Sequence, residues 1–203
     1  PHQGPVLMVG NLSPRRGGDI RWSVSHNAGR DGDIAFYLRR RGRPVTAPSL
    51  VKVGPNLRST SPRGYRFDLA RNWTLVRALI THPTVRVQWI FIAKYLRRAL
   101  LDHARRRGTS AKLLAAAERI LKQPSDSLSH ADHYHVRIYC SREDRLAGCR
   151  DRAPWWPGVK SYDLAVARRI RLLLPALRDP AAGVRKRALD LLVRLDARAS
   201  ALS

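Results

Sequence analysis

Three histidines lie within the six-residue segment HADHYH, which ends at His135. The whole chain has seven histidines, so this local density points to a function. Successive side chains of an extended strand point to opposite faces, so His133 and His135 are expected on one face and Tyr134 on the other. His130 breaks this alternation and is expected in the loop that leads into the strand. The segment therefore predicts two imidazoles aimed at one point, with a third close by.

A second group of polar residues lies in the segment SHNAGRDGDI, residues 25–34. In this segment His26 is followed seven residues later by Asp33. Gly29 and Gly32 stand between them and permit a tight reversal of the chain. Such a reversal would bring the imidazole and the carboxylate onto one metal ion. The alternative for both segments is a set of ordinary surface residues.

Together the two segments offer two or three histidines and one or two aspartates. This is the ligand chemistry of a catalytic zinc ion, which takes three protein ligands and keeps a fourth position open for water. Zinc held in this way lowers the pKa of its water toward about 7 and polarises a carbonyl. Hydrolysis then needs a nearby base, and a histidine that is not a ligand would supply it. The two segments thus predict a zinc-dependent hydrolase.

The segments SHNAGRDGDI and HADHYHVRIYC resemble those of the penicillin-insensitive murein endopeptidases. These are zinc peptidases related to lysostaphin-type enzymes, D-alanyl-D-alanine metallopeptidases and the hedgehog signalling domain. The similarity extends from about Ser23 to Cys149. The resemblance implies that His26, Asp33 and His135 are the ligands of one zinc ion per chain.

The same resemblance implies that His133 is the general base or a stabiliser of the transition state, with His130 as a further active-site histidine. Arg137 is expected on the same strand face as His133, where it would bind a substrate carboxylate. Asp31 is expected to support the site or to face solvent rather than to be a ligand.

The reaction implied by the resemblance is hydrolysis of the amide between D-alanine and meso-diaminopimelate in peptidoglycan cross-links. One alternative keeps the zinc but removes a terminal D-alanine, as a D-Ala-D-Ala carboxypeptidase or dipeptidase. Another alternative is a non-catalytic cell-wall-binding module that contains zinc. The presence of His133 beside a full ligand set favours an enzyme over a pure binding module.

The composition is that of a folded protein with an excess of arginine. The chain has 203 residues, is 44% hydrophobic and carries a net charge of +24. Arginine recurs along the whole sequence, which indicates a compositional bias rather than one nucleic-acid-binding surface. We therefore expect no specific nucleic acid, but a non-specific attraction to anionic envelope polymers or lipids. No apolar run approaches the roughly 18 residues that a transmembrane segment needs.

The two cysteines, Cys140 and Cys149, flank the polar stretch SREDRLAG. Two free thiols are one interpretation, but a disulfide is favoured if the protein is exported, because such bonds persist in oxidising compartments. The sequence begins at Pro1 rather than methionine, so an export signal is allowed upstream of it. We expect a protein of the periplasm or of the cell envelope.

The hydrophobic pattern predicts an α+β fold, in which a small antiparallel sheet with flanking helices holds the zinc site and a helical extension follows at the C-terminus. Residues 1–158 are expected to form the metallopeptidase domain. Residues 159–203 are expected to form the extension, either as part of a HEAT-like repeat or as a plain helical hairpin. The expected strands are residues 5–9, 33–38, 85–92 and 133–139, the expected helices are 67–80, 93–107 and 111–122, and residues 39–64 are expected to form a long loop.

Overall fold

The structure is a computed structural model. It describes residues 4–21, 23, 25–125, 127–141, 144, 149–157, 159 and 169–200, with the side chains of residues 195–200 left out. Packing divides the chain into two units, Pro1–Tyr139 and Cys140–Ser203, which are described separately. The domain boundary expected after residue 158 stays a prediction, because residues 158 and 160–168 lie outside the described part.

A five-stranded sheet forms the centre of the first unit, in the order β1-β2-β10-β8-β9. Its strands are β1 (Val9–Leu12), β2 (Asp31–Ala35), β8 (Val87–Phe91), β9 (Leu121–Lys122) and β10 (His133–Ile138). The pairs that join β1, β2, β10 and β8 are antiparallel, and only β9 runs parallel to its neighbour β8. The predicted α+β class with a small antiparallel sheet is therefore confirmed.

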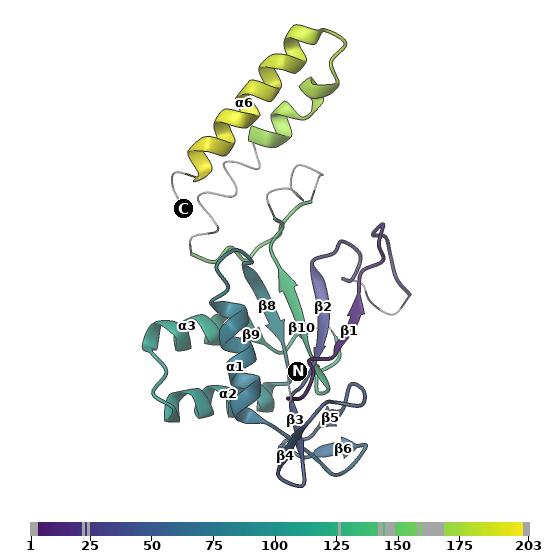
Figure 1. Cartoon of the computed structure of the whole chain (residues 1–203), viewed down its shortest axis with the longest axis vertical. Coiled ribbons are helices and arrows are strands. Elements are labelled where there is room, and N and C mark those ends of the chain that lie inside the picture. Colours follow the sequence, from purple (N-terminus) through teal and green to yellow (C-terminus); the bar gives the residue numbers. More distant parts are fainter. Residues whose placement is uncertain are drawn as a thin grey trace. The chain divides into compact units, whose positions relative to one another are not determined.

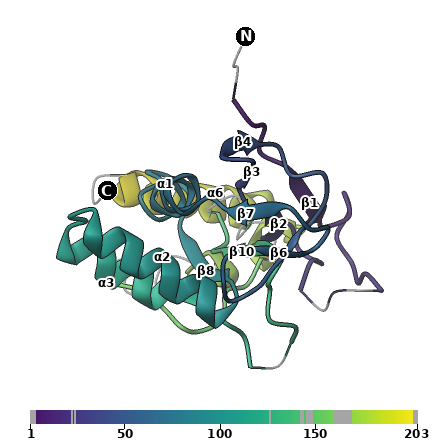
Figure 2. The same cartoon turned by 90° about the horizontal axis from the view of Figure 1, so that it is seen from below.

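Three helices pack against one another, and α2 and α3 contact the β8–β9 side of the sheet. They are α1 (Leu69–Ile80), α2 (Lys94–Arg106) and α3 (Ala111–Ile120). Figure 1 shows them beside β8, and the view from below in Figure 2 shows the same three helices on the side of the sheet away from β1. Asp68 is the N-cap of α1, one residue before the helix, and accepts a hydrogen bond from the backbone N–H of Arg71 at 3.2 Å.

The prediction of a long loop at residues 39–64 is wrong. Strands β3 (Leu38–Arg40), β4 (Arg43–Val45) and β7 (Tyr65–Phe67) form a second sheet, and β5 (Lys52–Val53) pairs with β6 (Ser59–Ser61). These strands are two or three residues long, and the Arg-, Pro- and Gly-rich sequence hides their period-2 pattern. Figure 1 shows β3, β4, β5 and β6 grouped at the end of the main sheet where β2 ends and β10 begins.

Three predicted boundaries also differ from the structure. The strand expected at residues 33–38 starts earlier and ends at Ala35, because the backbone of Tyr37 is held by the buried side chain of Asn72. The strand expected at residues 5–9 begins only at Val9. The helix expected at residues 111–122 ends at Ile120, and the next two residues pair with β8 as β9.

The core of the first unit lies between the main sheet and the helices. Tyr134, the residue between the two strand histidines, is fully buried, which confirms the expectation that it lies on the core-facing side of β10. The other fully buried large apolar side chains are Leu38, Val51, Val53, Val76, Ile90, Ile92, Leu96, Leu100 and Leu121.

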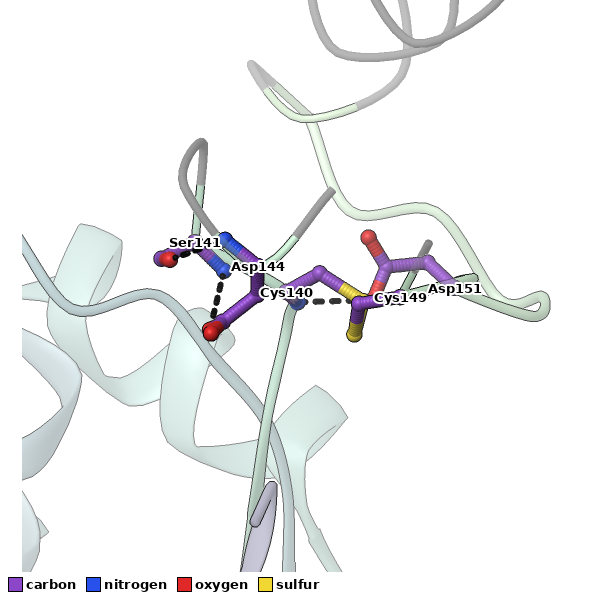
Figure 3. The surroundings of a disulfide bond; sticks show 5 residues. All are labelled: Cys140, Ser141, Asp144, Cys149 and Asp151. Carbon is purple, nitrogen blue, oxygen red and sulfur yellow. Dashed lines mark hydrogen bonds between the residues drawn. A yellow bond between two sulfur atoms is a disulfide. The ribbon is translucent and has the colours of Figure 1, made fainter. Parts of the chain in front are cut away.

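The second unit contains the predicted disulfide and helices. Cys140 and Cys149 are bonded, and Asp151 accepts a hydrogen bond from the backbone N–H of Cys140 at 2.8 Å (Figure 3). Residues 169–173 are helical, a 3₁₀ helix η1 follows at Pro175–Arg178, and α6 spans Ala182–Ser200.

The segment VRKRALDLLVRL has apolar residues at helical spacing, which predicts one apolar face made of Val184, Ala188, Leu191, Leu192 and Leu195. In α6 part of this face is exposed. Ala188 is buried, but Val184 and Leu191 are 40% and 47% exposed. The side chain of Leu195 lies outside the described part. The assignment of these helices to a HEAT-like repeat or to a plain helical hairpin stays a prediction.

Candidate metal centre

The antiparallel pairing of β2 with β10 brings the two sequence motifs together. In this pair His135 lies directly opposite Asp33, and Arg137 lies opposite Asp31. Residues that face each other across an antiparallel pair have side chains on the same face, with Cβ atoms roughly 4.5–5.5 Å apart. The register therefore places an imidazole against a carboxylate although more than one hundred residues separate them in sequence.

His26 reaches the same point from the turn before β2. Its Nδ1 lies 2.7 Å from the Oγ of Ser23, so its Nε2 faces the sheet, 3.2 Å from the Oδ1 of Asp33. Gly29 has φ +71°, a backbone conformation that glycine adopts at low cost, and it makes the expected reversal. Gly32 has no such φ, because it belongs to β2, so the expected reversal lies before it.

The side chains of His26, Asp33 and His135 are buried, and each offers one ligand atom within 4.8 Å of the others. The Oδ1 of Asp33 lies 3.2 Å from the Nε2 of His26 and 3.6 Å from the Nδ1 of His135. Both the Nε2 of His26 and the Oδ1 of Asp33 are buried without a hydrogen-bond partner. Buried polar atoms normally have such partners, and the converging atoms of this group fit a divalent cation.

Each of the three side chains is held from its other side. Asn11 donates a hydrogen bond to the Oδ2 of Asp33 at 2.8 Å. The Nε2 of His135 donates to the Oδ1 of Asp31 at 2.7 Å, which directs the Nδ1 lone pair toward Asp33. Partners of this kind fix the tautomer and the orientation of metal-binding imidazoles.

Asp31 is a buried carboxylate with two partners, as expected of a supporting residue. Besides His135, it accepts a hydrogen bond from the Nε of Arg137 at 2.8 Å. Burial alone would raise the pKa of Asp31, but the hydrogen bonds from these two residues hold it below its usual value. Asp31 therefore stays ionised and accepts the hydrogen bond from the Nε2 of His135.

His133 lies beside the three converging side chains. Its Nδ1 donates to Asp132 at 2.7 Å, and its Nε2 lies 3.3 Å from the Oδ1 of Asp33. Burial would lower the pKa of His133, but the contacts with these two aspartates raise it to about 9. Burial also opposes ionisation of Asp33, yet its partners, His133 first and Asn11 among the others, lower its pKa to about 2.

His130 lies in the loop before β10, as expected, and its ring centre is 5.1 Å from that of His133. Its Nδ1 donates to the backbone carbonyl of Leu128 at 2.7 Å. Burial, together with the nearby rings of His133 and His135, lowers the pKa of His130 to about 4. The three histidines 130, 133 and 135 form a second group of converging nitrogens that shares His135 with the first. The first group contains a carboxylate and the unpartnered atoms, and it therefore suits a cation better.

The structure thus brings together all six histidine and aspartate residues named from the sequence for the site. It also places Arg137 on the same face, where its Nε is engaged by Asp31. Sequence reasoning missed Asn11, Ser23 and Asp132. Asp132 is adjacent to His133, which was a usable signal, whereas nothing local marks Asn11.

The fold and the site define a class: an α+β protein with a His-Asp-His group, able to hold a cation, on one face of an antiparallel sheet and flanked by two further histidines. The family model of the penicillin-insensitive murein endopeptidases matches residues 2–162, and the chain belongs to this family. No curated protein and no solved structure matches the chain. The family membership identifies a peptidoglycan hydrolase. Among the described residues, no helix has the length and apolar character needed to cross a membrane.

Proposed function

We propose that this protein is a zinc-dependent endopeptidase that hydrolyses the D-alanyl-meso-diaminopimelyl amide of peptidoglycan cross-links. His26, Asp33 and His135 would hold the zinc ion, His133 would assist the proton transfers and His130 would line the active site. The family supports a murein-cleaving activity, and the donor set supports the metal.

The observation that carries the proposal is the pair of unpartnered atoms, the Nε2 of His26 and the Oδ1 of Asp33. Leaving two such atoms buried costs free energy, and a cation bound between them would remove that cost. Two imidazole nitrogens and one carboxylate oxygen are a common protein donor set of catalytic zinc.

Zinc at this position would activate a water molecule and polarise the amide carbonyl of the substrate. The protein's own contribution is the position of His133. Its Nδ1 is fixed by Asp132, so its Nε2 is directed to the side of the site where Asp33 presents its free oxygen. In the protonated form that its raised pKa favours, it would stabilise the negative charge that develops on the carbonyl oxygen, and it would take a proton from the attacking water only after losing its own.

We also propose that the protein acts in the periplasm or elsewhere in the cell envelope. Its substrate class lies there, and the Cys140–Cys149 disulfide fits an oxidising compartment. Arg137, which is partly exposed beside the site, would bind a carboxylate of the peptide stem with the donors that Asp31 leaves free.

The test is digestion of purified muropeptide dimers by the intact chain, with chelator and with zinc restored, alongside a measurement of bound metal. We expect about one zinc per chain and chelator-sensitive release of monomers. A monomeric pentapeptide serves as the second substrate. Loss of its terminal D-alanine without cleavage of the dimer would identify a carboxypeptidase instead, and the absence of bound zinc would contradict the proposal.

A further inference from the structure

A hollow of about 880 Å³ lies in the first unit, between the second sheet and the start of α1. None of the residues of the metal centre lines it. Five arginines from separate parts of the chain line it: Arg39, Arg41, Arg58, Arg63 and Arg66. We call this hollow the arginine pocket. The sequence had suggested arginines spread without focus, and the folding of residues 39–66 into short strands is what gathers these five.

The arginine pocket holds a large excess of positive charge. Its one acidic lining residue is Asp68, which is buried and has its Oδ2 3.8 Å from the Nε of both Arg39 and Arg71. The side chains of the other four lining arginines are exposed and form no ion pair within the described part of the chain: Arg41, Arg58, Arg63 and Arg66. Four arginines without an ion-pair partner in the described part of the chain thus line one hollow, against the single carboxylate of Asp68.

The backbone holds two of these arginines at tight turns. Arg41 and Gly42 join β3 to β4, with φ values of +48° and +77°. A positive φ is uncommon for a residue with a long side chain, and glycine and asparagine usually occupy such positions. Gly64, with φ +97°, makes the corresponding turn beside Arg63. Two short turns therefore present their arginines at the rim of the pocket.

Leu69 and Ala70, the first two residues of α1, also line the arginine pocket. The N-terminal end of a helix carries the positive end of its dipole, but the carboxylate of Asp68 already caps α1, so the attraction for an anion rests on the arginines.

We propose that the arginine pocket is a second binding site, for a ligand that carries phosphate groups on a body of about the size of a sugar. Guanidinium groups bind phosphate oxygens through paired hydrogen bonds, and one phosphate has enough oxygens to engage several of them. The volume of the pocket lies within the range of roughly 300–1,000 Å³ that is usual for small-molecule sites and leaves room for more than a bare phosphate. A free sugar phosphate and a phosphate-bearing lipid headgroup share this chemistry. The site is independent of the metal centre and of the reaction proposed there.

The experiment compares two double variants of the intact chain that lose the same charge. Arg41→Asn with Arg63→Gln removes the two arginines at the turns that border the pocket. Asparagine tolerates the positive φ at residue 41. Arg98→Gln with Arg119→Gln is the control, because both of these arginines are exposed on α2 and α3 and neither lines the pocket. Circular dichroism and thermal unfolding establish that each variant is folded.

The probes are inorganic pyrophosphate and glucose 1-phosphate, measured by titration calorimetry, and vesicles of phosphatidylcholine with and without phosphatidylglycerol, measured by sedimentation. We expect the Arg41→Asn, Arg63→Gln variant to bind the phosphate-bearing probes on the order of tenfold or more weakly than the original chain does, because hydrogen bonds to charged groups are lost. The affinity of the control variant should stay within about twofold of that of the original chain at the same salt concentration.

Binding of the soluble probes that depends on the pocket would identify a free phosphorylated ligand. Pocket-dependent binding of the phosphatidylglycerol vesicles alone would identify a headgroup. Equal weakening in the two double variants would show that only the net charge of +24 matters, and it would overturn the proposal. The absence of binding to every probe would overturn it as well.

Discussion

At the scale of single residues, the proposed metal centre assigns different roles to His135 and His133. His135 would hold the cation, because its Nδ1 faces Asp33 and its Nε2 is fixed by Asp31. His133 would assist proton transfer, because its Nδ1 is bonded to Asp132 and its Nε2 lies beside the site. The two histidines share one strand face, yet their substitutions should have different effects.

We expect His133→Ala to keep the bound zinc and to lose about 10²–10⁴ in turnover, which is the usual contribution of a group that transfers a proton. His135→Ala should lose the metal itself. Zinc content and dimer cleavage are measured on both proteins, with His82→Ala as the control on an exposed histidine. Normal zinc content and normal cleavage in both variants would show that the site is assigned wrongly.

Asp31 is predicted to act on the metal only through His135. Asp31→Asn keeps the size of the side chain but removes the charge that accepts the proton of His135 Nε2. We expect zinc affinity to fall about 10–100-fold, as for other partners of metal-binding histidines. Competition with a chromogenic chelator measures this affinity.

The matched control for Asp31→Asn is Asp190→Asn, on the exposed surface of α6. If both variants bind zinc equally well, the contact between Asp31 and His135 does not support the metal.

At the scale of elements, Asn72 on α1 fixes where β2 ends. It is fully buried, accepts a hydrogen bond from the N–H of Tyr37 at 3.0 Å and donates to the carbonyl oxygens of Tyr37 and Asp68 at 2.7 and 2.9 Å. These bonds satisfy the backbone at the point where the chain leaves the main sheet for β3. One side chain of α1 thus holds the segment between β2 and β3.

We expect Asn72→Ala to lower the free energy of unfolding by about 1–3 kcal/mol, because the N–H of Tyr37 would lose its partner, while its carbonyl oxygen would keep only the bond from the N–H of Asp68. Urea denaturation measures the loss. The control is Thr74→Ala, on the exposed side of the same helix. Its free energy of unfolding should stay within about 0.5 kcal/mol of that of the original chain. A comparable loss in both variants would point to helix propensity rather than to the contacts of Asn72.

At the scale of the whole molecule, the metal should stabilise the folded state, because the convergent site exists only there. Zinc at one thousand times its Kd would contribute about 4 kcal/mol. For a chain of this length, each kcal/mol raises the Tm by about 2–4 °C. We therefore expect chelator to lower the Tm by roughly 8–16 °C and added zinc to restore it.

Differential scanning calorimetry with and without chelator measures this shift. His26→Ala removes one of the three donors and should show a much smaller shift. If neither zinc nor chelator changes the Tm of the original chain, no cation binds between His26, Asp33 and His135.

The sequence alone determined the parts of this protein that depend on local periodicity. Alternation in HADHYHVRI placed His133 and His135 on one face and Tyr134 in the core, and the structure agrees. The helices and the two central strands were predicted within a few residues, because long amphipathic patterns are strong signals. The expectation of an exported protein favoured a bond between Cys140 and Cys149, and the structure contains it.

The tertiary structure decided what depends on residues far apart in sequence. The register that sets Asp33 against His135, the support from Asn11 and the arginine pocket all arise from chain segments whose meeting no local pattern encodes. The same reason explains the missed strands between residues 39 and 64, since strands of two or three residues are stabilised by their neighbours and not by their own sequence. Local sequence fixed which residue types are available on each face, and packing fixed which of them meet.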